Sequence, residues 1–186
     1  MDFYVNIFKN IASKEQGAFY FSDSDLDIGG GLYSPNVVFH LKIPYKHHQI
    51  SIINKMGTSY VGIYSCVLPL SLKAPDFTIN TKSHLSTLFS TDKKDRFKIV
   101  THHRKLQTFL ERSTSLKALN TIAKDTAFES YICGRNSTNE YELKIEYHLQ
   151  FDNWTQVLEP LIAFQKELIT LFESKNYTIS VHQNQN

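Results

Sequence analysis

The sequence predicts an α+β domain, and three observations lead to this fold class. Apolar and polar residues alternate from Tyr141 to Phe151, which is typical of a strand with one buried face. An apolar-striped helix follows at once, from about Asn153 to Glu173. The chain has 186 residues, of which 41% are hydrophobic and 13% aromatic, enough for the core of one domain. We therefore expect a single domain of antiparallel β-sheet, packed by a pair of central helices and a long C-terminal helix.

Residues 1–16 are expected to form an N-terminal helix. Phe3, Ile7, Phe8 and Ile11 recur at helical spacing, which favours a helix that docks on the domain. A weak helix at a membrane interface is the alternative. The segment is too short and too polar to span a membrane, and it lacks the features of a signal peptide. The expected location is cytoplasmic.

A β-rich half is expected over residues 22–75. The segment Ser22 to Gly31 is predicted to be a loop, since it is charged and glycine-rich. Its aspartates alternate as in a calcium loop, but Ile28 and Ser34 replace the required glycine and glutamate, so no calcium site is expected. Three strands joined by short turns follow, at 37–45, 49–55 and 59–70. Apolar residues on both sides of the third strand suggest that both of its faces are covered.

An α+β half is expected over residues 76–174, followed by a polar tail at 175–186. Its predicted elements are strands at 77–80 and 96–100, a helical turn at 83–89, helices within 102–124, a hairpin of 127–133 with 141–151, and the closing helix. Ser113, Thr114 and Ser115 should divide the central helical region in two, because hydroxyl residues favour caps. Pro160 should kink the last helix or mark its first turn. Tyr177 to Val181 could add an edge strand.

The order of these elements resembles a family of uncharacterised bacterial domains of unknown function. The resemblance covers roughly residues 28–172: a glycine-containing strand region, Phe77-Thr78-Ile79, the run from Asp95 to Val100 that leads into the paired helices, the hairpin and the closing helix. It implies a fold class and no activity. Members often carry membrane-spanning segments ahead of the domain, whereas this chain has only residues 1–16 there.

No residue spacing predicts catalysis, a metal site or a cofactor, so the chain is expected not to be an enzyme. Cys66 and Cys133 lie in strand-like runs and are expected to be buried free thiols. His40, His48 and His148 lack the spacing of a ligand set and are expected to be solvated strand histidines. An enzyme would require a cleft that combines a histidine and a carboxylate.

The charges are unevenly distributed although the formal net charge is only +2. A basic face on the paired helices is predicted to meet an anionic partner, namely a protein or an anionic surface, and its candidate residues are Lys93, Lys94, Arg96, Lys98, Arg104, Lys105 and Arg112, with Lys117 and Lys124 beyond them. A nucleic acid is the least favoured partner, since no recognition motif accompanies the charges.

Two hypotheses about function follow. The first is a non-enzymatic interaction domain that binds a protein partner through this basic helical face or through a sheet edge. The second is a small-molecule or lipid-binding protein with an apolar cavity between the sheet and the C-terminal helix. The sequence does not define the oligomeric state.

Overall fold

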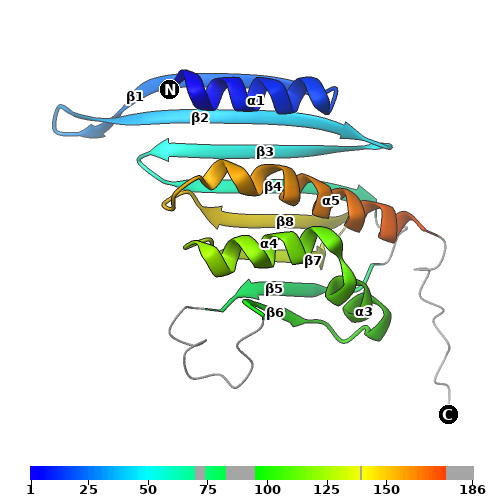
Figure 1. The fold of residues 1–186 in the computed structure, drawn as a ribbon. Coiled ribbons are helices and arrows are strands. Elements are labelled where there is room, and N and C mark those ends of the chain that lie inside the picture. Colours follow the sequence, from blue (N-terminus) through cyan, green and yellow to red (C-terminus); the bar gives the residue numbers. More distant parts are fainter. Residues whose placement is uncertain (70–73, 83–94, 139, 175–186) are drawn as a thin grey trace, which may run out of the picture.

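One eight-stranded antiparallel sheet forms the framework of the computed structural model, which describes residues 1–69, 74–82, 95–138 and 140–174 (Figure 1). The strands follow the spatial order β1-β2-β3-β4-β8-β7-β5-β6. Their bounds are β1 Ala18–Gly29, β2 Leu32–Tyr45, β3 His48–Gly57, β4 Val61–Pro69, β5 Phe77–Thr81, β6 Phe97–Val100, β7 Ser130–Asn136 and β8 Glu140–His148. The predicted α+β class with an antiparallel sheet is confirmed. The two expected halves share this sheet, because β4 pairs with β8.

The helices of the described residues all lie on the same face of the sheet (Figure 1). They are α1 Asp2–Lys14, α3 Arg104–Arg112, α4 Thr114–Asp125, the short 3-10 helix η2 Trp154–Val157, and α5 Leu158–Glu173. Helix α1 covers β1 and β2, and α5 crosses the middle of the sheet near β4 and β8. No helix in the described part of the chain is long and apolar enough to cross a membrane.

The alternation predicted for β8 is confirmed, and it separates a helix-covered face from an open one. Tyr141, Leu143, Ile145 and Tyr147 are buried under the helices, while the residues between them are half-buried on the other face. The expectation that β4 is covered on both sides is wrong. Its Tyr64, Cys66 and Leu68 are buried, but Val67 on the opposite face is exposed, because no helix of the described residues packs there.

The segment Ser22 to Gly31 is not a loop for most of its length, which corrects the prediction. It belongs to β1 up to Gly29, and its aspartates pair in register with β2, Asp23 facing Val37 and Asp27 facing Tyr33. Only Gly30 and Gly31 lie in the turn, and Gly29, Gly30 and Gly31 have φ values of 93°, 67° and 74°. These left-handed conformations are the ones that glycine adopts without a Cβ penalty.

The helical predictions hold where the structure describes the chain. The region 102–124 divides into α3 and α4, and the Ser113 hydroxyl accepts a hydrogen bond from the Leu116 amide as the N-cap of α4. Pro160 lies in the first turn of α5, where it disrupts no helical hydrogen bond. The helical turn predicted at 83–89 and the edge strand predicted at 177–181 fall outside the described residues.

The core lies between the sheet and the helices and is filled by large side chains. Tyr64, at the centre of the sheet, is fully buried and donates a hydrogen bond to the Leu158 carbonyl at the start of α5. The Tyr147 hydroxyl donates to Asn54 Oδ1 over 2.6 Å. Gly62 leaves the space for the Tyr147 ring, since a Cβ there would lie 2.2 Å from it. Tyr64 therefore packs beneath the start of α5, and Tyr147 fills the space that Gly62 leaves in the sheet.

Candidate functional site

A groove of about 560 Å³ crosses the outer face of α5 and is the candidate functional site. Tyr45, at the end of β2, borders it on one side, and Phe109 of α3 borders it on the other. The residues that line it are Tyr45, Phe109, Ala163, Lys166, Glu167, Thr170, Leu171 and Ser174. Phe109 and Leu171 are partly buried hydrophobic side chains whose other atoms pack against the core. The groove therefore combines an apolar floor with polar ends.

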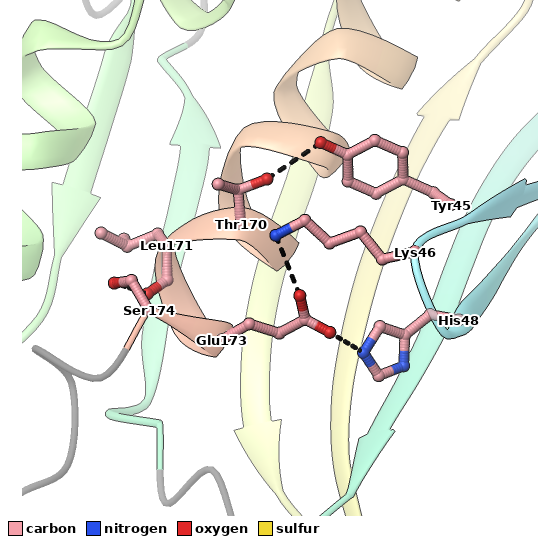
Figure 2. A network of polar contacts seen from close by, with 7 residues as sticks. All are labelled: Tyr45, Lys46, His48, Thr170, Leu171, Glu173 and Ser174. Atoms are coloured by element: carbon pink, nitrogen blue, oxygen red, sulfur yellow. Dashed lines mark hydrogen bonds and ion pairs between the residues drawn. The ribbon is translucent and has the colours of Figure 1, made fainter.

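The β2–β3 side of the groove is fixed to α5 by a network of polar contacts (Figure 2). Glu173 near the C-terminus of α5 accepts from Lys46 Nζ over 2.9 Å and from His48 Nε2 over 2.7 Å. The Tyr45 hydroxyl lies 2.9 Å from Thr170 Oγ1. The Lys46 contact, reinforced by His48, lowers the pKa of Glu173. These contacts join a strand turn to a helix 125 residues away in the sequence.

The cation of Lys166 and the ring of Tyr45 meet at the same side of the groove. Lys166 Nζ lies 5.2 Å from the centre of the Tyr45 ring and forms an ion pair with Glu15, just after α1. A cation at this distance over an aromatic face is attracted to it. This side of the groove is thus held by contacts from α1, β2 and α5.

The α3–α4 side of the groove is fixed by Glu167. Its two carboxylate oxygens each accept a hydroxyl hydrogen bond of 2.6 Å, one from Ser113 and one from Ser115. Both serines lie at the start of α4, where a carboxylate also interacts favourably with the helix dipole. Glu167 therefore sets the position of the α3–α4 junction, and with it Phe109, relative to α5.

The structure brings together three residues of the predicted basic face. Arg104, Lys105 and Arg112 are exposed on α3, and Lys105 and Arg112 lie four residues before and three residues after Phe109. Side chains at these spacings share one side of a helix. None of the ion pairs among the described residues involves these three cations. Lys105 and Arg112 do not line the groove, but with Phe109 they form a cationic rim beside it on α3.

The other candidates lie elsewhere. Arg96 is only 4% exposed, and its guanidinium donates to the carbonyls of Lys82 and Ala123, so it stabilises the end of α4 and contributes little surface. Lys98 is exposed on the short edge strand β6, and it alternates with the buried Phe97. Lys93 and Lys94 lie outside the described residues.

The histidines and cysteines have local partners or are buried. His48 contacts Glu173, the His40 ring lies 2.9 Å from Ser51 Oγ, and His148 accepts from the Gln150 amide. The strands that carry His40 and His148 are separated by β3 and β4. Within the described ranges, no group of three or more metal-ligating side chains could hold an ion.

Both cysteines are free and buried. Burial raises the pKa of the Cys66 thiol to about 12 and also raises the pKa of Cys133. Both thiols are therefore protonated at neutral pH, in the form that is a poor nucleophile.

Sequence reasoning identified the cations of α3 but missed the groove beside them. Tyr45, Phe109 and Leu171 come from three distant segments, and their proximity depends on the packing of α3 and α5. The one local signal is the spacing of Lys105, Phe109 and Arg112, which places an aromatic residue between two cations on one helix face. Comparisons with family models, with characterised proteins and with solved structures find no match to this chain.

Proposed function

We propose that this chain is a non-enzymatic interaction module whose groove across α5 binds an acidic amphipathic helix of a protein partner. The observation that carries the proposal is the combination of a groove of about 560 Å³ with exposed cations of α3 that have no ion pair among the described residues. Helix-in-groove recognition uses an apolar stripe for affinity and flanking charges for orientation and specificity.

The dimensions of the groove fit a short helix. Its floor extends from Ala163 to Ser174 on α5, which is about 17 Å at 1.5 Å per residue. A partner helix of three turns has this length. Its apolar residues would contact Phe109 and Leu171, and acidic residues on its flank would face Lys105 and Arg112.

The test uses two designed 14-residue peptides with leucine at helical i, i+3, i+4 and i+7 spacing. One carries glutamate at the remaining positions and the other carries lysine. Fluorescence anisotropy with the full chain should show at least tenfold tighter binding of the glutamate peptide. The variant Lys105→Glu/Arg112→Glu should weaken that binding at least tenfold. The matched control is Lys9→Glu/Lys55→Glu, which changes two exposed lysines on other elements and should have little effect.

Equal binding of the two peptides, or no effect of the α3 substitutions, would contradict this proposal. The second candidate function is binding of a small anionic amphiphile, since the groove volume lies in the range of about 300–1,000 Å³ found for ligand pockets. A fluorescent fatty acid distinguishes the two candidates. Saturable binding of the fatty acid, without binding of the glutamate peptide, would favour the small-molecule function.

A further inference from the structure

The outer edge of β1 is a second surface that lacks a partner among the described residues. β1 is 12 residues long and lies at one end of the sheet, where it pairs only with β2 among the described strands. All of its residues except Phe19 are exposed. An edge strand presents backbone N–H and C=O groups that another extended chain can pair with.

The end of the β1–β2 hairpin extends past the start of α1, so no helix covers it (Figure 1). Four exposed large hydrophobic side chains lie on this part of the hairpin, namely Leu26 and Ile28 of β1 and Leu32 and Tyr33 of β2. Edge strands are usually protected against such exposure by shortness, charge, bulges or a covering element. β1 is long for an edge strand and carries only charge and a bulge near Asp27.

The charge on β1, the turn and the start of β2 is of one sign. Residues 18–36 contain Asp23, Asp25 and Asp27 and no lysine or arginine. Because strand side chains alternate between faces, the three aspartates lie on one face, and Ser22, Ser24 and Leu26 lie on the other. Directly opposite residues of an added strand would share these faces.

We propose that β1 from Ser22 to Ile28 receives an extended protein segment in which cationic and apolar residues alternate. In one register the cations lie opposite Asp23, Asp25 and Asp27, while the apolar residues lie on the face of Leu26. Backbone hydrogen bonds supply affinity in such strand addition, and the alternate side chains supply specificity. This alternating pattern identifies the partner. The proposal for the β1 edge does not depend on the groove on α5.

A second copy of the chain does not fit this edge when the helices of both copies lie on the same side of the joined sheet. Antiparallel pairing centred near the middle of β1 then places Asp23 opposite Asp23 or Asp25. Like charges directly opposite each other destabilise a strand pair. The aspartates therefore act against this form of self-association and in favour of a cationic strand.

The experiment uses the full chain and an eight-residue peptide of four Lys-Val repeats, with anisotropy as the readout. Three comparison peptides are four lysines followed by four valines, four Glu-Val repeats, and the Lys-Val peptide with N-methylated backbone amides. The Lys-Val peptide should bind at least tenfold tighter than each of the three. Comparable binding of the rearranged peptide would indicate attraction by charge alone and would overturn the proposal, as would comparable binding of the N-methylated peptide.

Protein variants test which edge is used. Asp23→Asn/Asp25→Asn/Asp27→Asn should weaken binding of the Lys-Val peptide at least fivefold. Asparagine retains the side-chain oxygen with which Asp27 accepts a hydrogen bond from the Gly29 amide, so the hairpin turn is preserved. The matched control, Asp125→Asn/Glu129→Gln/Asp152→Asn, removes three exposed carboxylates from outside β1.

Unchanged binding in the β1 variant, with its Tm unaltered, would overturn the proposal. Sedimentation velocity of the unliganded chain provides a further test. Self-association that is abolished by an edge substitution such as Leu26→Pro would assign the edge to a second copy and would also overturn the proposal.

Discussion

The substitution Glu167→Gln tests whether one carboxylate joins α5 to the α3–α4 junction. In the native protein Glu167 accepts hydrogen bonds of 2.6 Å from the hydroxyls of Ser113 and Ser115. A hydrogen bond to a charged group contributes about 1.5–3 kcal/mol to stability, compared with about 1 kcal/mol for a neutral one. Glutamine keeps one carbonyl oxygen and gains an amide that donates to a hydroxyl oxygen, so both contacts lose their charge and one of them must reverse its direction.

The two contacts together lose about 1 kcal/mol, taken at the lower end of these values because Glu167 is only half-buried. The interaction of the carboxylate with the N-terminus of α4 adds about 0.3–1 kcal/mol to the loss. For a chain of 186 residues, a total loss of about 1.3–2 kcal/mol lowers the Tm by about 3–8 °C. Differential scanning calorimetry measures this shift directly.

The matched control is Glu159→Gln in the same helix. Glu159 forms an ion pair of 2.9 Å with Lys14, and both side chains are about 60% exposed, so the Tm should hardly change. A double-mutant cycle adds Ser115→Ala to each background. Because the two residues are in contact, the cost of Ser115→Ala should be at least 0.5 kcal/mol smaller once Glu167 is glutamine. The reasoning is refuted if Glu167→Gln lowers the Tm no more than Glu159→Gln does.

Further substitutions probe the core and, at Glu173, the network of Figure 2. Gln165→Met should raise the free energy of unfolding by about 1 kcal/mol in chemical denaturation, because the side-chain amide of Gln165 is fully buried without a hydrogen-bond partner among the described residues. Glu173→Gln should flatten the dependence of the Tm on pH between pH 6 and 3. The folded-state pKa of the native Glu173 carboxyl group is lowered, so the stability that this group contributes is present above its unfolded-state pKa and is lost as the pH falls through its folded-state pKa. An unchanged acid profile would contradict the role assigned to Glu173. Gly62→Ala should lower stability by about 1–3 kcal/mol, since its methyl group would overlap the Tyr147 ring, and Tyr147→Leu should reduce that cost.

The fold could be predicted from the sequence wherever one side of an element is buried. β8 and α5 each show the period of their backbone, because burial selects apolar residues on one face only. β1 was missed because its outer part is exposed on both faces and so has no apolar alternation. Its aspartates and glycines are also the residues that strands disfavour. Only the register with β2 makes this segment a strand.

The candidate site was predictable only in its charges. The sequence assigns Arg104, Lys105 and Arg112 to an exposed helix face. Counting charges placed Arg96 with them, because it does not show which cations are buried. The guanidinium of Arg96 instead satisfies the Ala123 carbonyl at the end of α4, a requirement that arises from the position of β6 beside that helix end. Similarly, the groove depends on how α3 packs against α5, and no local pattern contains that information.

The two proposed binding surfaces should act independently because of their separation along β2. Asp23 faces Val37, which precedes Tyr45 of the groove by eight residues, or about 26 Å of strand. This distance exceeds the Debye length of about 8 Å at physiological ionic strength, so the acidic hairpin and the cationic rim of α3 are screened from each other. Saturation of the groove with the glutamate peptide should therefore change the affinity for the Lys-Val peptide less than twofold. A larger change at 150 mM salt would show that the sheet transmits strain between the two surfaces, and the model of two separate sites would fail.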